Sequence, residues 1–144
     1  MKIAVSACLL GEKCRYDGET KQDESVLEML KGAEVIPFCP EAPVLGTPRE
    51  RISVVYSKEH GYTLIGDVSK IEVTSAIKLE TQKMIDGYPD LDKIILKSKS
   101  PSCGIGTTPM MSTEGSLLCY GNGIAAQMLL EAFSEIDVID EKNF

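Results

Sequence analysis

The sequence of 144 residues lacks tryptophan, has a single histidine, and has fewer basic than acidic residues, 15 Lys and Arg against 22 Asp and Glu. The formal net charge of −7 argues against a nucleic-acid partner, because proteins that bind the phosphate backbone need a basic face. No apolar stretch approaches the roughly 20 residues that span a membrane. The first residues, "KIAVSA", resemble a strand and not a secretory signal. We therefore expect no nucleic-acid partner, no membrane partner and a cytoplasmic location.

Cysteine is present in an odd number, five, so the thiols cannot all pair within one chain. Reduced thiols are typical of the cytoplasm, which supports the same location. The length and the 43% hydrophobic content are sufficient for one domain with its own core. We expect residues 1–144 to form a single domain.

Short apolar runs alternate with segments of helical periodicity along the chain. Strands are predicted over 2–7, 34–38, 93–97 and 136–140, helices over 23–33, 69–87 and 121–135, and a β-hairpin over 52–57 and 62–66. This alternation predicts an α/β fold with a mainly parallel sheet flanked by helices in a Rossmann-like three-layer arrangement. The hairpin is expected to be a small insertion.

Three cysteines lie just beyond the predicted ends of three strands: Cys8, Cys39 and Cys103. In open parallel sheets, the loops past the carboxyl ends of the strands form the ligand crevice. Cysteines that are far apart in the sequence can therefore meet at one edge of the sheet. One buried cysteine at such a position would mean little, but three predict a site.

The first of these loops, "CLLGEKCR", resembles the catalytic loop of low-molecular-weight protein tyrosine phosphatases. In that loop a cysteine thiolate attacks a phosphate held by backbone N–H groups and an arginine. Five residues separate the cysteine from the arginine there, whereas six separate Cys8 from Arg15 here. The extra residue displaces the guanidinium from the phosphate, so this interpretation is the weaker one.

The alternative is a site that binds a metal or a cluster through thiolates from separate loops. No C-x2-C pair is present, which disfavours a zinc ribbon, and no ferredoxin-type run of cysteines occurs. The loops do bring a carboxylate, Glu41, and hydroxyls such as Ser98 and Ser100 near the thiols. Soft thiolates suit iron–sulfur clusters or zinc. Three thiolates on a four-iron cluster would leave one iron without a protein ligand, free to act as a Lewis acid.

Four segments carry a resemblance to a known family: "SACLLGEKCRYDG", "CPEAPVLGTPRE", "LKSKSPSCG" and "GNGIAA". Together they resemble the domain-of-unknown-function 523 family, whose characterised members are 2-thiouracil desulfurases. The resemblance runs from Ser6 to the last predicted helix. It implies a [4Fe-4S] cluster bound by Cys8, Cys39 and Cys103. The end of the second segment departs from the family pattern at Glu50 and Arg51, and we assign Arg51 no role.

The resemblance also implies a reaction, the non-redox conversion of a thiolated nucleobase such as 2-thiouracil to uracil and hydrosulfide. The substrate sulfur would bind the open iron, and water would add to the carbon. Glu41 and Ser100 fall on the family's positions that work with the substrate, and they are the expected catalytic residues. The expected substrate-binding residues are Arg15, Tyr16, Asp17 and Ser98.

A non-catalytic protein that uses the same cysteines as a sensor or structural staple is the other class considered. A staple does not need an acid–base residue beside its ligands, so Glu41 with Ser100 favours the enzyme. Of the two other cysteines, Cys119 is expected to be a buried strand residue. Cys14 lies near the proposed site but is expected to be dispensable as a ligand. Lys97 and Lys99 are expected to be solvated.

Overall fold

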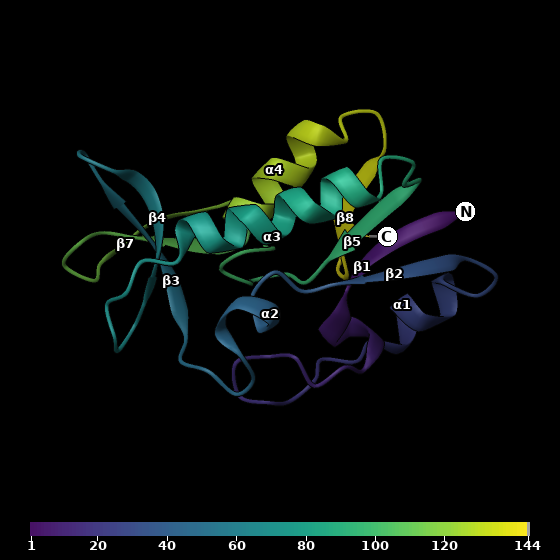
Figure 1. Cartoon of the computed structure of the whole chain (residues 1–144), viewed down its shortest axis with the longest axis horizontal. Coiled ribbons are helices and arrows are strands. Elements are labelled where there is room, and N and C mark those ends of the chain that lie inside the picture. The colour runs from purple at the N-terminus through teal and green to yellow at the C-terminus, as the bar shows by residue number, and fades with distance from the viewer. Residues whose placement is uncertain (144) are drawn as a thin grey trace.

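The computed structural model describes residues 1–143, and its centre is a four-stranded parallel sheet, called here the first sheet (Figure 1). The strands in spatial order are β2 (Glu34–Phe38), β1 (Lys2–Ser6), β5 (Lys93–Leu96) and β8 (Asp137–Asp140). β1 pairs in parallel with β2 on one side and with β5 on the other, and β5 pairs in parallel with β8. After β1 the chain continues to β2 on one side of the sheet, and after β5 it continues to β8 on the other side. A crevice is therefore expected beyond the carboxyl ends of β1 and β5.

Helices cover both faces of the first sheet. They are α1 (Glu24–Met29) on one face and α3 (Thr74–Gly87) and α4 (Ile124–Ala132) on the other (Figure 1). Alternate residues of β1 face opposite ways: Val5 packs with Val26 of α1, and Ala4 packs with Leu129 of α4. The start of α1 is fixed by Asp23, whose carboxylate accepts the N–H of Val26 at 3.1 Å.

A second sheet extends from this body, at the left of Figure 1. Its strands in spatial order are β4 (Gly61–Gly66), β3 (Ile52–Ser57), β6 (Thr108–Met111) and β7 (Leu117–Gly121). The pair β3–β4 is the hairpin expected from the sequence. It lies in the connection from β2 to β5, and a second antiparallel pair, β6–β7, lies in the connection from β5 to β8. The two pairs join through parallel contacts between β3 and β6.

The α/β class with a parallel sheet between helices is confirmed. The hairpin has nearly the expected bounds, but it forms half of a second sheet and not a separate small insertion. The strand β6 was not predicted, because "TPMM" is short, carries Pro109 and does not alternate. The helix predicted over 69–87 begins only at Thr74. The residues before Thr74 form a turn, and Glu72 bridges to Ile65 of β4.

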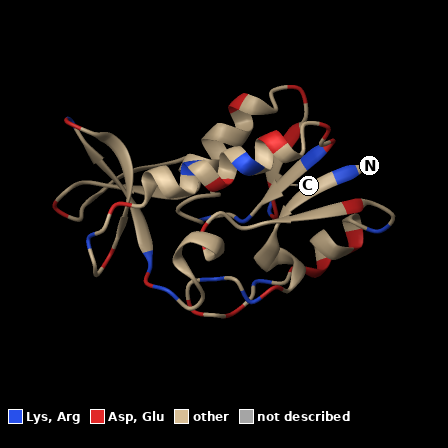
Figure 2. Cartoon of the chain, in the orientation of Figure 1, with Lys and Arg blue, Asp and Glu red and all other residues tan. Residues whose placement is uncertain are grey.

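The charged residues lie mainly on the outer helices and loops, while most of the strand positions are uncharged (Figure 2). This distribution leaves both sheets free to pack through apolar side chains. Within residues 1–143, none of the helices combines the length and the apolar character that a membrane span needs.

Candidate active site

A cavity with a volume of about 120 Å³ opens beyond the carboxyl ends of β1, β2 and β5. Its walls come from the loops after these three strands and from a segment that follows Cys39. The lining residues are Ser6, Ala7, Cys8, Cys14, Arg15, Tyr16, Phe38, Cys39, Pro40, Glu41, Arg49, Lys97, Ser98, Lys99, Ser100, Pro101, Ser102 and Cys103. The three cysteines expected to converge at this edge all line one cavity.

The loop after β1 is a 3-10 helix, η1 (Ala7–Leu10), which carries Cys8 almost fully buried. Two donors fix its backbone, because the carbonyl of Cys8 accepts the hydroxyl of Thr20 at 2.8 Å and the N–H of Lys21 at 3.1 Å. A hydrogen bond with the Cys14 thiol lowers the pKa of Cys8. Cys8 is therefore the readiest of the cavity thiols to ionise.

The loop after β2 carries Cys39 into a four-residue helix, α2 (Ala42–Leu45). The N–H of Ala42 donates to the sulfur of Cys39 at 3.4 Å, which orients the sulfur at the start of the helix. The pKa of Cys39 is raised, chiefly by a hydrogen bond with Cys14 and also by burial.

Cys14 lies between Cys8 and Cys39, with which it shares its thiol hydrogen bonds. The bond to Cys39 lowers the pKa of Cys14, but the bond to Cys8 and burial outweigh it and raise the pKa to about 11. A thiol with so high a pKa remains protonated at neutral pH. Because the pKa values of Cys39 and Cys103 are raised as well, this shift does not separate a ligand from a spare thiol, and the dispensability of Cys14 stays a prediction.

The loop after β5 is shaped by Ser100, whose hydroxyl oxygen accepts the N–H of Cys103 at 3.0 Å. The start of α4 holds the same loop from the other side: the N–H of Ala126 donates to the Ser102 carbonyl at 3.0 Å, and that of Gly123 to Gly104 at 2.8 Å. These amides are among those that a helix N-terminus leaves without partners in the helix. A Cβ on Gly123 would lie 2.4 Å from the carbonyl carbon of Ser102, so the close approach requires glycine.

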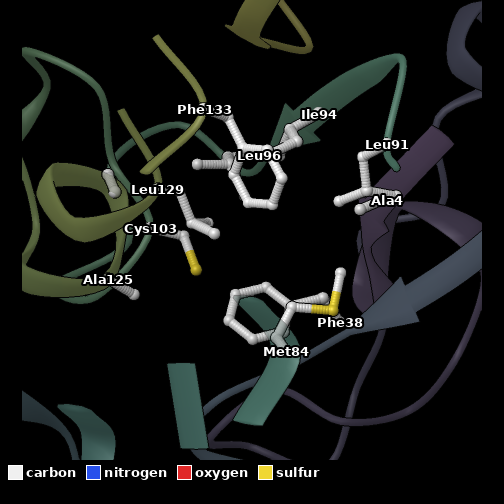
Figure 3. Packing of buried hydrophobic residues seen from close by; sticks show 11 residues of the cluster. Ala4, Phe38, Met84, Leu91, Ile94, Leu96, Cys103, Ala125, Leu129 and Phe133 are labelled. Carbon is white, nitrogen blue, oxygen red and sulfur yellow. The ribbon is translucent and has the colours of Figure 1, made fainter. Parts of the chain in front are cut away.

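Cys103 itself is 4% exposed and packs beside Leu129, with its sulfur directed into the apolar cluster (Figure 3). Burial raises the pKa of Cys103, and the negative charge of Glu41 raises it further. A cation or an electrophilic metal at the sulfur would offset this cost by stabilising the thiolate.

Glu41 is buried at 9% exposure and faces the cavity. One of its carboxylate oxygens accepts the hydroxyl of Ser102 at 2.5 Å, and the other lies 3.4 Å from the guanidinium of Arg49. Ser102 is fully buried, and its oxygen lies 3.4 Å from that of Ser100, so a string of hydroxyls leads from Ser100 to the carboxylate. Ser100 and Glu41 are both expected to act on the substrate, and the hydroxyl that contacts Glu41 directly is that of Ser102.

Arg49 is not among the expected site residues, and from the sequence its pairing with Glu41 is only the alternative to a catalytic role of Glu41. Its Nη1 donates to the carbonyl of Cys14 at 2.9 Å and to that of Gly46 at 3.0 Å, which ties the first and second loops together. The short helix α2 between Glu41 and Arg49 brings the guanidinium back beside the carboxylate.

The expected substrate-binding residues divide into two groups. Arg15 and Tyr16 line the cavity, and the Tyr16 ring lies 5.4 Å from the Arg15 guanidinium and 4.6 Å from that of Arg51, which also donates to its hydroxyl. Asp17 is exposed, and it accepts the N–H of Glu19 in a turn without lining the cavity.

Ser98 lines the cavity, but both its N–H and its hydroxyl donate to Glu141, at 2.7 and 3.1 Å. Its donors are thus engaged by the protein. The expectation of a solvated Lys97 was wrong: its side chain is 18% exposed, and its ammonium lies 3.1 Å from the Glu141 carboxylate. The reason is that β8 ends beside β5, so Glu141 follows β8 directly onto this edge. Lys99 is exposed, as expected.

The donor set fits an iron–sulfur cluster. Three free thiols from three loops reach one cavity, and thiolates are the ligands that such clusters prefer. Over residues 1–143, no three His, Cys, Asp or Glu side chains gather closely enough to hold one metal ion. Thiols spread around a cavity suit a group with several irons better than a single ion.

Comparisons with known proteins agree with this geometry. The profile of the 2-thiouracil desulfurase family matches residues 3–142. An uncharacterised protein of Bacillus subtilis (strain 168), YbbK, is 30% identical in an alignment 142 residues long that covers 90% of this chain and 90% of YbbK. The solved structure of the [4Fe-4S]-dependent thiouracil desulfidase TudS matches with a TM-score of 0.77 and 30% identity, over 99% of this chain and 92% of that one. These matches confirm the resemblance drawn from the motifs, and the chain belongs to the enzymes of the 2-thiouracil desulfurase family.

Proposed function

We propose that this enzyme removes sulfur from a small thiolated nucleobase by hydrolysis, giving uracil and hydrosulfide when the substrate is 2-thiouracil. The observation that supports this function best is the convergence of Cys8, Cys39 and Cys103 with Glu41 on one buried cavity. The three cysteines would hold a [4Fe-4S] cluster, the group named for the structural neighbour TudS. When bound, the cluster supplies a Lewis-acidic iron that polarises the C=S bond.

Glu41 is the general base of the proposal. Its carboxylate takes a proton from the water that adds to the thione carbon and passes this proton to the departing sulfur, while the hydroxyl left on the carbon loses its proton to solvent as the C=O bond forms. Ser102 and Arg49 hold the two carboxylate oxygens, so the base is oriented before the substrate arrives. Such preorganisation avoids rearrangement during the reaction.

Ser100 has two tasks. Its oxygen accepts the N–H of Cys103 and so fixes the loop, while its own proton remains free for a bond toward Ser102 or toward the cavity. A water or a ring carbonyl in the cavity can therefore be linked through Ser100 and Ser102 to Glu41. This makes Ser100 a positioning group for the reacting partners.

Arg15 and Tyr16 form the wall of the cavity that would contact the substrate nucleobase. The ring of Tyr16, with guanidinium groups near it, offers a flat surface for stacking a pyrimidine. We place the reaction in the cytoplasm, because all five cysteines are free thiols and a thiolate-bound cluster needs reducing conditions.

The test is anaerobic reconstitution of the purified protein with iron and sulfide, followed by incubation with 2-thiouracil. We expect a brown protein with about four irons per chain, and uracil and hydrosulfide formed in equal amounts. Zinc-loaded and apo protein serve as controls and should be inactive. Iron binding without turnover of any thiolated base in a panel would favour a sensor or a staple and contradict the enzyme.

A further inference from the structure

Lys97 and Glu141 form a buried ion pair at the wall of the cavity, and the reaction described above uses neither residue. The Glu141 side chain is only 3% exposed. Its carboxylate forms an ion pair with the ammonium of Lys97 at 3.1 Å and accepts a hydrogen bond from the N–H of Ser98 at 2.7 Å. Burying two charges costs desolvation energy, so such a pair calls for a role beyond stability.

The geometry restricts what Lys97 can do. An ammonium has three N–H donors, and those of Lys97 point to the Ser98 carbonyl at 2.8 Å, the Ser98 hydroxyl at 3.3 Å and the Glu141 carboxylate. No donor remains for a substrate. What Lys97 can present to the cavity, which it lines together with Cys8, is its positive charge.

The positive charge of Lys97 is one of several around the cavity. Although the protein has a net charge of −7, the cavity is lined by four cationic residues and one carboxylate, Glu41. The cations are Arg15, Arg49, Lys97 and Lys99. Arg49 is engaged by Glu41, and Lys99 is exposed to solvent, which screens its charge. Lys97, which is partly buried and paired with Glu141, is the cation on the β5 side of the cavity.

We propose that Lys97 stabilises the anionic group held by the cysteines through its charge, and that Glu141 is a positioning residue that holds the ammonium at the cavity wall. This inference rests on the proposed [4Fe-4S] cluster, since a cluster with thiolate ligands is anionic. A fixed cation in a poorly solvated site favours an added negative charge on such a group far more than one in water does.

The experiment measures the midpoint reduction potential of the reconstituted protein by anaerobic redox titration. Lys97→Met removes the cation and should make the midpoint potential more negative than in the wild type. Lys97→Arg keeps the cation and should leave the midpoint potential near the wild-type value. Glu141→Gln removes the counter-charge and should shift the midpoint in the opposite direction. Lys83→Met and Glu80→Gln, which split an exposed pair on α3, are matched controls and should leave the midpoint unchanged.

A role limited to fastening the loop predicts another result. Lys97→Met and Glu141→Gln would then both lose iron and both lower the Tm of the apo protein, with an unchanged midpoint in the clusters that remain, and that result would overturn the proposal. Iron loss from Lys97→Met with a wild-type apo Tm, and with iron retained by Lys97→Arg, would support it. Failure of the wild type to bind iron would refute the proposed function itself, which separates the two tests.

Discussion

The two sheets of this protein contain the same kinds of residue and use them differently. In the first sheet, parallel strands are buried between helices, and the loops at their carboxyl ends bring thiols, a carboxylate and an ion pair into one cavity. In the second sheet, β7 is an edge strand whose Leu117, Leu118 and Tyr120 are 49–61% exposed, and none of its residues lines the cavity. Location in the fold, and not residue type, decides which side chains take part in chemistry.

Cysteine shows the difference most directly. Cys103 follows a strand of the first sheet and is buried at the cavity, whereas Cys119 lies on β7 and is exposed. Cys119 was expected to be a buried strand residue. The strand is correct, but the burial was wrong, because β7 is at the edge of a sheet that extends from the body.

The second sheet nevertheless serves the site, because it is built from the two segments that follow Cys39 and Cys103. Parallel pairing of β3 with β6 joins these segments. At the start of β6, the hydroxyl of Thr108 donates to the carbonyl of Ser100 at 2.6 Å. The second sheet therefore braces the loops of the first.

The largest effect is expected from exchanging one cysteine in each region. Cys39→Ser should lose nearly all bound iron after reconstitution, because it removes a ligand from the cavity. Cys119→Ser should keep iron near the wild-type content, and Cys14→Ser should do the same. Iron per chain and the visible absorption spectrum measure this. Equal iron loss from Cys119→Ser would break the contrast between the two sheets.

Glu41→Gln should have the next largest effect. It keeps the shape of the side chain and one of the two acceptor oxygens but removes the base, so turnover per bound cluster should fall by about 10²–10⁴-fold. Iron content and binding of 2-thiouracil should remain. If Glu41 served only as the partner of Arg49, the variant would lower the Tm modestly while turnover per cluster stayed near the wild-type value.

The sequence was sufficient to predict the parts of the fold that follow from periodicity. All four first-sheet strands and the helices α1, α3 and α4 were placed, and the loop cysteines followed from the rule for parallel strands. The pairing of Lys97 with Glu141 could not be predicted, because it depends on which strands are neighbours. β5 and β8 are adjacent, but their sequence pattern does not say so.

The site itself was predicted as a set of residue types and less well as contacts. Glu41 lines the cavity, and its catalytic role stays a prediction; its bond to Ser102 rather than Ser100 depends on how the turn before Cys103 folds. Three serines at alternate positions cannot be ranked without that turn. Asp17 lies in a segment that resembles the family motif, but in the structure it forms part of a surface turn.

Gly123→Ala should have a moderate effect, at the point where the second sheet returns to the first. The new Cβ would meet the backbone of Ser102 at 2.4 Å, so the free energy of unfolding should fall by about 1–3 kcal/mol. Denaturant unfolding of the apo protein measures it. Gly87→Ala, where a Cβ meets nothing within 4 Å, is the control and should raise stability by up to about 1 kcal/mol. Equal effects would show that α4 does not press on the cysteine loop.

The smallest effect is expected from Arg51→Ala, which cuts a contact between the two regions. Arg51 directly precedes β3 of the second sheet, and it stacks on Tyr16 of the first loop and donates to its hydroxyl. An exposed cation–π contact contributes about 0.5–1 kcal/mol. If Tyr16 contacts the substrate nucleobase, losing this contact corresponds to about a 2–5-fold rise in KM. kcat should not change, because Glu41 and the cysteines are untouched. Steady-state kinetics with 2-thiouracil separates KM from kcat, and Arg51→Lys, which keeps the charge, should lie between. A fall in kcat with KM unchanged would mean that the second sheet positions the catalytic groups themselves, and not only the wall that holds the substrate.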